Sequence, residues 1–204
     1  MIAGVEAPDR ASITGVILAG GRGSRMNGSD KGWVLHAGRP LVEWAIARLQ
    51  GQVDEIVLNA NRNLERYRAL GFPVVTDDAG FTAFSGPLVG MLAGLRGANR
   101  PWVCFVPCDA PALPPDLVAR LARASAGRSP AYAHSGGRAQ PVVCLLPRSA
   151  QDQLESAQRA GRRMPREFLG ELGAVAVEFD DVGAFANINS PADVIPEAGV
   201  RTDG

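Results

Sequence analysis

The chain has 204 residues, with 21 basic and 21 acidic side chains and a formal net charge of zero. This length suits one α/β domain with a sizeable core and is too short for two ordinary domains. A general nucleic-acid binder usually carries a basic excess, so the charge balance argues against nucleic acid as a partner.

Cysteine spacing and hydropathy narrow the class of protein further. Cys104, Cys108 and Cys144 form an odd set without a C-x-x-C pair, which argues against a disulfide framework and against structural zinc. No apolar run approaches the roughly 20 residues that a membrane-spanning helix needs, and no signal peptide is visible. We therefore expect a cytoplasmic protein that does not contact a membrane.

The first informative stretch runs from Val16 to Gly32 and reads VILAGGRGSRMNGSDKG. Its apolar start predicts a buried strand, which leads into a glycine-rich loop that also carries Arg22, Arg25 and Lys31. Few Cβ atoms hold a ligand away from such a loop, so several backbone N–H groups can converge on phosphate oxygens. The cations can neutralise the phosphate charge. The stretch therefore predicts a polyphosphate site.

Neither common phosphate-binding loop fits this stretch. A P-loop needs lysine directly after its second glycine, but Ser29 follows Gly28 and Lys31 comes too late. The dinucleotide fingerprint needs glycine or alanine where Met26 stands. The loop must belong to another class of phosphate site.

Beyond the loop, predicted strands and helices alternate. Short apolar runs mark the strands, and apolar residues at helical spacing mark the helices, with Asn63 expected to cap one of them. We predict strands over residues 54–61, 72–76, 102–106, 131–134, 142–146 and 175–179, and helices over 40–49, 63–70, 87–97 and 150–160, with a further helix from 114 and a helical turn at 191–194.

This order of elements predicts an α/β fold with three layers, helix–sheet–helix, around a mostly parallel, twisted, Rossmann-like sheet. We expect a single domain over residues 12–197, a flexible N-terminal extension over 1–11 and a flexible tail over 198–204. Residues 79–86 combine small and aromatic side chains with glycine and are expected to form a mobile flap over a site.

Polar residues follow several predicted strands, where a parallel sheet presents its ligand-binding edge. Asp109 follows one strand between Pro107 and Pro111, which stiffen its turn. A lone carboxylate there suits Mg²⁺, although an isolated aspartate is more often a turn or helix cap. Asn59 and Asp77 end two other strands; each is a candidate nucleotide contact or an ordinary turn residue.

Two motifs together carry a resemblance to a known family. They are Leu18-Ala19-Gly20-Gly21, continued by Arg25-Met26 and Asp30-Lys31-Gly32, and Pro107-Cys108-Asp109-Ala110-Pro111. They resemble nucleotidyltransferases and, among these, the molybdenum cofactor guanylyltransferases. The resemblance continues through residues 59–62, 86–88, 161–163 and 187–191, so it covers about residues 13–195; Gln140 departs from the family's usual histidine, and Asn27 from its glycine.

The resemblance implies a nucleotidyltransferase fold and a reaction. GMP would pass from GTP to the terminal phosphate of molybdopterin or its molybdenum form, with Mg²⁺ as cofactor and diphosphate as product. The implied catalytic residues are Arg25, Lys31 and Asp109, with Asp109 as the metal ligand. The implied nucleotide contacts are Leu18, Ala19, Gly20, Gly21, Lys31, Asn59, Asp77 and Asp109, and the implied acceptor contacts are Arg162, Arg163, Asn187 and Asn189.

Alternatives stay open at this point. A transferase of the same fold that uses CTP or a sugar-phosphate acceptor has the same loop, as does a non-catalytic nucleotide sensor. The implied partners are GTP, the pterin acceptor and molybdoenzyme maturation proteins, and we expect a monomer. The resemblance implies that cytidylyl relatives have alanine at the position of Gly20. We interpret the glycine either as leaving room for a purine base or as adopting a turn with positive φ.

Overall fold

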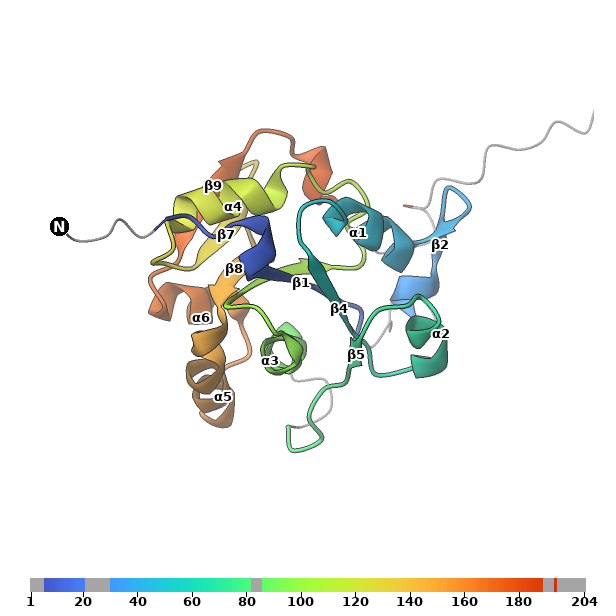
Figure 1. Ribbon diagram of the computed structural model, residues 1–204, viewed down its shortest axis with the longest axis horizontal. Helices are drawn as coiled ribbons and strands as arrows, with labels where there is room; N and C mark the ends of the chain where they lie inside the picture. The colour runs from blue at the N-terminus through green and yellow to red at the C-terminus, as the bar shows by residue number, and fades with distance from the viewer. Residues whose placement is uncertain (1–5, 21–29, 82–85, 189–192, 194–204) are drawn as a thin grey trace, which may run out of the picture.

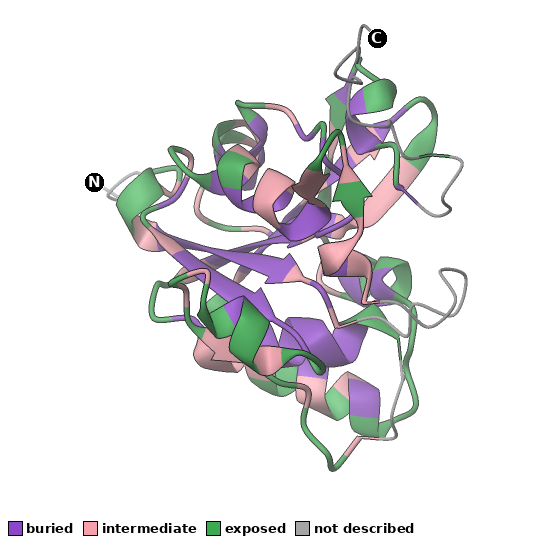
Figure 2. Ribbon diagram, turned by 90° about the vertical axis from the view of Figure 1, so that its right-hand side faces the viewer, coloured by how far each residue is buried: buried purple, intermediate pink, exposed green. Residues whose placement is uncertain are grey.

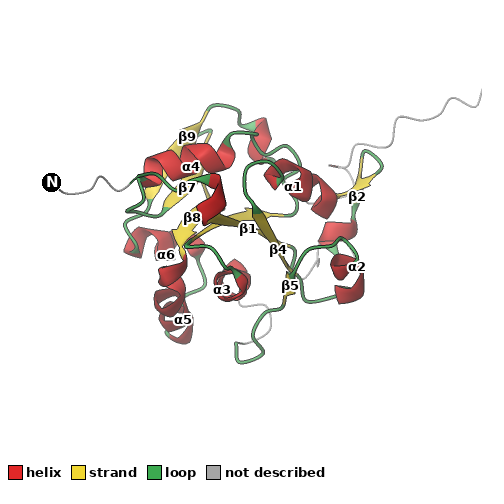
Figure 3. Ribbon diagram, viewed as in Figure 1, coloured by secondary structure: helices red, strands yellow, loops and turns green. Residues whose placement is uncertain are grey.

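The computed structural model describes residues 6–20, 30–81, 86–188 and 193 (Figure 1). A seven-stranded sheet forms its centre and has helices on both faces (Figure 3). The strands of this sheet are β1 (Ile13–Leu18), β4 (Glu55–Asn59), β5 (Val74–Val75), β6 (Trp102–Pro107), β7 (Ala131–Ser135), β8 (Arg138–Pro147) and β9 (Val175–Phe179). The helices are α1 (Leu41–Leu49), α2 (Leu64–Arg68), α3 (Pro87–Gly97), α4 (Leu117–Ser125), α5 (Gln151–Arg159) and α6 (Pro165–Glu171).

Shorter elements connect these. A small hairpin pairs β2 (Leu35–His36) with β3 (Arg39–Pro40), and single 3-10 turns are η1 (Arg10–Ser12), η3 (Lys31–Trp33), η4 (Arg148–Ala150) and η5 (Gly183–Phe185). Asp9 caps η1 through its side chain, and Arg10 donates to the Gly51 carbonyl and pairs with Asp54. The end of the predicted N-terminal extension is thus packed on the domain, and the domain limits stay a prediction.

The strand order is β5-β4-β1-β6-β8-β7-β9. Every neighbouring pair is parallel except the two pairs that include β8, so β8 alone runs against the other six strands. The chain moves outward from β1 to β4 and β5, then crosses back to place β6 on the other side of β1. In open α/β sheets the usual ligand position is a crevice at such a reversal, which here falls beyond the carboxyl ends of β1 and β6; we call this region the crevice.

The sheet separates two hydrophobic cores, as expected of a three-layer fold. Ile13 and Ile17 of β1 face the core beneath α1 and α4, whereas Val16 faces the core beneath α3, α5 and α6. This alternation follows from the two-residue period of a strand. The buried colouring in Figure 2 runs through the sheet and the inner sides of the helices, and exposed residues lie on the outer sides.

Helix α3 packs unusually close to the sheet because it carries glycine on its inner face. A Cβ on Gly94 would lie 2.8 Å from side-chain carbons of both Val16 and Phe105. A Cβ on Gly90 would lie 2.4 Å from Oδ1 of Asn59. Both glycines therefore let the helix backbone approach the strands, which a larger residue would prevent.

The predicted fold class and most predicted elements are confirmed, and the differences have local causes. α6 and the β2–β3 hairpin were not predicted, because each is short and lacks a long periodic pattern. Asn63 occupies the N-cap position of α2 with φ of 50° and forms no capping hydrogen bond; its side-chain amide donates to Asp30 instead. Within the described ranges, no helix is long and apolar enough to cross a membrane.

Two glycine-to-alanine substitutions test the packing of α3. Gly94→Ala adds a methyl group where Val16 and Phe105 leave no room, so we expect a loss of about 1–3 kcal/mol in the free energy of unfolding. The matched control is Gly170→Ala in α6, where no atom of the described residues outside the neighbouring helix backbone lies within 4 Å of the added Cβ. There we expect a gain of about 0.5–1 kcal/mol from helix propensity. Urea unfolding measures both; equal effects of the two changes would contradict the close packing.

Candidate functional site

Three parallel strands end side by side at the crevice. Leu18 at the end of β1 pairs with Asn59 of β4 on one side and with Pro107 of β6 on the other. The ladder continues one residue further, because the Ala19 N–H donates to the Asn59 carbonyl at 2.8 Å and the Cys108 N–H donates to the Leu18 carbonyl at 3.1 Å. The sheet register alone therefore brings Leu18, Ala19 and Asn59 close to the start of the Asp109 turn.

A cluster of amides and one carboxylate fills the β4–β5 side of this edge. Nδ2 of Asn59 donates to Oδ1 of Asp77 at 2.9 Å, and Nδ2 of Asn61 donates to Oδ2 of Asp77 at 2.7 Å. Oδ1 of Asn61 accepts from the Asp77 backbone N–H at 2.8 Å. Asn59 is buried, and Asn61 is exposed. Asn61 was not predicted as a site residue, although it stands two positions after Asn59 in the same matched stretch.

Gly20 lies against the same cluster. Its carbonyl accepts from Nδ2 of Asn61 at 3.2 Å. A Cβ at this position would lie 2.7 Å from that nitrogen and 3.0 Å from Oδ1 of Asn59. The φ of Gly20 is outside the left-handed region, so the alternative of a positive-φ turn is wrong. A larger residue fits here only if the amide of Asn61, which occupies the space beside Gly20, moves away.

Asp109 and Lys31 meet on the other side of Gly20, in the crevice between β1 and β6. Nζ of Lys31 donates to Oδ2 of Asp109, and the two side chains are 21% and 12% exposed. Oδ1 of Asp109 is buried and has no hydrogen-bond partner among the described residues. The backbone carbonyl of Asp109 accepts from the Ile188 N–H at 2.9 Å, which places the end of Asn187 beside this turn. Lys31 therefore contacts Asp109, and the backbone that follows Asn187 lies beside them.

The orphaned oxygen of Asp109 fits a divalent cation. An unpaired buried carboxylate oxygen is costly, and Mg²⁺ is usually held by one or two carboxylates together with substrate phosphates. The described residues contain no group of three or more histidine, cysteine, aspartate or glutamate side chains that would hold a metal without substrate. The donor set present thus suits an ion that is shared with a polyphosphate.

A cavity of about 490 Å³ opens where α5 ends. Gly161 follows α5 with φ of 83°, and Arg162 and Arg163 come directly after this turn. The lining residues are Asp78, Gly80, Phe81, Gln158, Arg159, Gly161, Arg162 and Arg163. Two of the four predicted acceptor contacts therefore share one basic cavity. Gln158 was not predicted; it is buried, and within the described ranges its Nε2 has no hydrogen-bond partner.

Helix α3 connects the cavity to the amide cluster. A Cβ on Gly86, at the start of α3, would lie 3.2 Å from the Arg163 carbonyl oxygen, whereas Gly90 lies against Asn59. These two glycines are four residues apart, which is about one helical turn of roughly 6 Å. One residue of the predicted acceptor cavity, Arg163, and one of the predicted nucleotide edge, Asn59, thus both lie against the first turn of α3.

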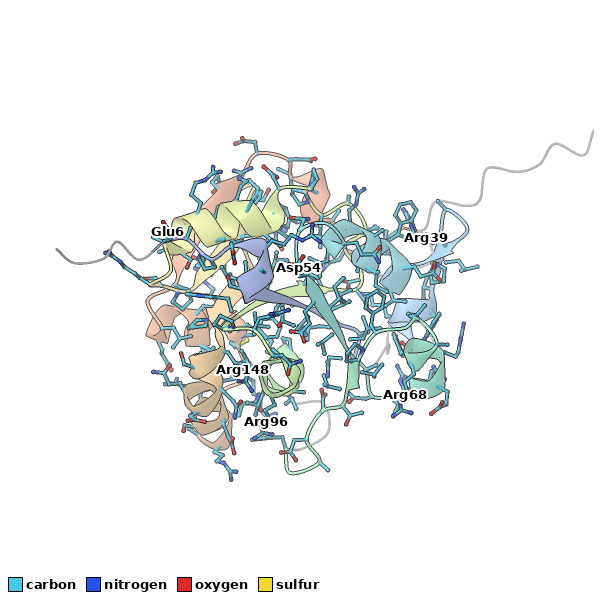
Figure 4. The ribbon with its side chains drawn as sticks, in the orientation of Figure 1. Glu6, Arg39, Asp54, Arg68, Arg96 and Arg148 are labelled. Atoms are coloured by element: carbon cyan, nitrogen blue, oxygen red, sulfur yellow. The ribbon has the colours of Figure 1, made fainter. Side chains whose placement is uncertain are left out.

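Ion pairs fix the outer wall of the cavity. Arg96 near the end of α3, labelled in Figure 4, donates to Asp78 at 2.9 Å and to Glu155 of α5 at 2.7 Å. The Gly80 backbone N–H and then the Arg96 guanidinium hold the pKa of the Asp78 carboxyl below its ordinary value. Arg162 pairs with Glu171 of α6 at 2.7 Å. At least one basic residue of the cavity, Arg162, is therefore paired with a carboxylate.

Some predicted residues lie outside the described ranges, and others lie away from the site. Gly21, Arg25, Asn27 and Asn189 lie outside the described residues, as do residues 82–85 of the predicted flap over 79–86 and all of the predicted helical turn at 191–194 except residue 193. Gln140 lies in β8 opposite Ala133, next to an irregularity in the β7–β8 register. Burial raises the pKa of the Cys104 thiol to about 12, and all three cysteines are buried and free, which removes them as nucleophiles.

Comparison with known proteins identifies the family. Residues 15–175 match the profile of the MobA-like NTP transferase domain. The chain belongs to this family. A protein from Cupriavidus metallidurans named molybdenum cofactor guanylyltransferase is 46% identical over 188 residues, which cover 89% of this chain and 92% of that protein. A protein of the same name from Yersinia pestis is 45% identical over 183 residues, covering 89% and 93% of the two chains.

Solved structures agree with this assignment. The molybdopterin-guanine dinucleotide biosynthesis protein A of Archaeoglobus fulgidus is 25% identical and superposes with a TM-score of 0.70, covering 88% of this chain and 94% of that chain. The inositol-1-phosphate CTP transferase of T. maritima has a TM-score of 0.72 at 15% identity, covering 91% and 93%, and shows the fold alone. The stretch matched to the MobA-like domain contains the amide cluster, Asp109 and Arg162, whereas Asn187 follows it.

Gly20→Ala tests the contact between Gly20 and Asn61 in this MobA-like domain. The added methyl group displaces the Asn61 amide, a flexible group, from Asp77. We therefore expect about a tenfold loss of GTP affinity with little change in the midpoint of thermal unfolding. Titration calorimetry with GTP and CTP measures the affinities.

The double variant Gly20→Ala with Asn61→Ala is the control. Because the shortest contact of the added methyl group is with the Asn61 side chain, the double variant should bind GTP nearly as well as Asn61→Ala alone. A uniform loss of affinity for both nucleotides, together with a lowered midpoint of unfolding, would contradict this reading of Gly20.

Proposed function

We propose that this protein transfers GMP from GTP to the terminal phosphate of molybdopterin or its molybdenum form and releases diphosphate. The observation that carries the proposal is the contact beyond the carboxyl end of β6 between Lys31 and the buried Asp109, one oxygen of which has no hydrogen-bond partner among the described residues. The identity of 46% with a protein named molybdenum cofactor guanylyltransferase supports the same donor and acceptor.

The nucleotide half of the proposal rests on the strand ends. Leu18, Ala19, Gly20 and Gly21 would line the base and sugar, with Asn59 and Asp77 as polar contacts. The amide cluster supports this placement, because it presents fixed donors and acceptors at one edge. Arg25 and Lys31 would lie along the triphosphate, where their charges offset the charge that develops as diphosphate leaves.

Asp109 would hold Mg²⁺ through Oδ1, the oxygen that has no other partner. When bound, this ion would supply Lewis-acid stabilisation of phosphate oxygens. Oδ2 of Asp109 pairs with Lys31, so the carboxylate has one oxygen for the lysine and one for the ion. The fit between the unpartnered oxygen and a hard cation supports metal dependence.

The acceptor half rests on the basic cavity. Arg162 and Arg163 would bind the phosphate of the pterin substrate, and Asn187 and Asn189 would contact it from the segment beside Asp109. Gln158 offers a buried amide donor on the same wall. The route along α3, from Gly86 beside Arg163 to Gly90 beside Asn59, supports an approach of the acceptor to the nucleotide.

The chemistry needs positioning more than proton transfer. An oxygen of the acceptor phosphate attacks the α-phosphorus of GTP; a new P–O bond forms as the bond to the bridging oxygen breaks, and diphosphate leaves with that electron pair. The attacking oxygen is already anionic, so no strong general base is required. This agrees with the two histidines, since His134 pairs with Glu178 on β9, and His36 lies in the β2–β3 hairpin.

One incubation tests the function. The protein is mixed with Mg²⁺, one nucleoside triphosphate and one acceptor, and the products are identified by mass spectrometry. We expect a pterin guanine dinucleotide from GTP and molybdopterin. A product only with CTP, or only with a sugar phosphate, would favour the related transferases, and binding without any product would favour a nucleotide sensor.

The cellular setting is part of the proposal. We propose a monomer in the cytoplasm that passes its product to molybdoenzyme maturation proteins. Three free, buried cysteines support a reducing compartment, where disulfides are rare.

Asp109→Asn tests the metal site. The amide keeps the shape of the side chain but loses the charge that would hold Mg²⁺, so we expect turnover to fall by at least about a hundredfold while the protein stays folded. Diphosphate release is measured across a Mg²⁺ titration, with circular dichroism as the fold check. The control is Asp116→Asn, an exposed carboxylate without a capping hydrogen bond, which should leave turnover unchanged. Normal activity of Asp109→Asn at limiting Mg²⁺ would remove Asp109 from the site.

Arg162→Ala tests the acceptor cavity. Loss of one cation from the cavity should raise the KM for the acceptor about tenfold and leave the affinity for GTP unchanged. The control is Arg166→Ala, an exposed arginine four positions later that does not line the cavity. Steady-state kinetics and GTP calorimetry separate the two substrates. A loss confined to GTP affinity would show that Arg162 serves the other substrate.

A further inference from the structure

A buried tyrosine lies directly behind the segment that carries Lys31. Tyr67 of α2 is fully buried, and its hydroxyl donates to Oδ1 of Asp30 at 2.7 Å. Asp30 precedes Lys31 and is the N-cap of η3, where the same Oδ1 accepts from the Gly32 backbone N–H at 3.3 Å. The hydroxyl therefore acts, through one carboxylate, on the residues immediately before and after the lysine.

The backbone of η3 rests on this hydroxyl. A Cβ on Gly32 would lie 2.3 Å from the Tyr67 hydroxyl oxygen, so no larger residue fits there without movement. The ring of the next residue, Trp33, packs against the Tyr67 ring with 5.1 Å between ring centroids and an angle of 55° between the ring planes. Nδ2 of Asn63, at the start of α2, donates to Oδ2 of Asp30 at 3.0 Å. Helix α2 thus holds η3 through three separate contacts.

The Tyr67 hydroxyl keeps its proton and therefore acts only as a hydrogen-bond donor to Asp30. Burial, followed by the hydrogen bond to Asp30, raises the pKa of the Tyr67 phenol far above its ordinary value. Tyr67 is therefore protonated at every pH at which the protein would work, and its hydroxyl always donates to the carboxylate rather than accepting. Burying a neutral phenol beside a carboxylate costs less free energy than burying two adjacent negative charges.

Lys31 reaches from this fixed backbone across the crevice to Asp109 on the far side of β1. A lysine has a long, flexible side chain, so its ammonium group is placed only as well as its backbone is held. We propose that Tyr67 is a positioning residue, which holds Asp30 and Gly32 so that Lys31 meets the triphosphate of the nucleotide. This inference rests on the proposed role of Lys31 as a nucleotide contact.

Tyr67→Phe removes the hydroxyl and keeps the ring that packs on Trp33. Since the hydroxyl bonds a charged group, we expect GTP affinity to fall about tenfold. In the Lys31→Ala background the same change should cost nothing further, because the group that it positions is absent. Tyr132→Phe is the control; this is the chain's other tyrosine and packs in the core beneath α3, α5 and α6. It should leave GTP affinity unchanged. Calorimetry with GTP measures all five proteins, including the wild type.

The outcomes separate the inference from the function on which it rests. Equal losses in both backgrounds, or no loss in the wild-type background, would overturn the positioning role while GTP binding by the wild type upholds the nucleotide site. Failure of the wild type to bind GTP would overturn both. If Tyr67→Phe does not fold, Asp30→Ala takes its place in the same cycle, because it removes the acceptor of the hydroxyl from a half-buried position without disturbing the buried ring.

Discussion

The site depends on the register of three parallel strands at the point where the sheet reverses its order. Leu18 is flanked by Asn59 and Pro107, so the residues that follow each strand enter the crevice at the same height. Parallel strands have evenly spaced hydrogen bonds, and a slip of one residue would turn every side chain to the opposite face. The two cores prevent such a slip, because Ile17 and Val16 of β1 pack in different layers.

Polar side chains pack at this edge of the sheet where glycine residues leave space for them. Gly90 of α3 leaves space for the buried Asn59 amide, and Gly20 leaves space for the amide of Asn61. Asp77 then finds a donor for each of its carboxylate oxygens. Buried polar groups are costly unless paired, so a half-built version of this cluster would be less stable than an apolar one. The two glycines and the two asparagines therefore depend on one another, because a larger residue at either glycine would displace an asparagine side chain.

Asp109 differs from Asp77 in this respect, because one of its oxygens is paired with Lys31 and the other has no partner. A paired carboxylate stabilises the fold, whereas an unpartnered buried oxygen costs free energy that a ligand can recover. Nε2 of Gln158, on the wall of the basic cavity, is a second buried atom without a hydrogen-bond partner in the described part of the chain. Two more such atoms, Nε1 of Trp33 and Oγ of Ser125, lie outside the proposed substrate contacts.

The sequence by itself determined the fold class, most of the element order and the matched motifs, because apolar periodicity and glycine-rich turns are local properties. It also placed Asn59, Asp77 and Asp109 at strand ends. Only the tertiary structure decided which site residues contact one another. Lys31 and Asp109 are 78 positions apart in the sequence, and the crossover from β5 to β6 lies between them. The roles of Asn61 and Tyr67 were likewise invisible in sequence. An asparagine after a strand and a tyrosine in a short helix are common, and their partners, Gly20 and Asp30, are supplied by packing between distant segments.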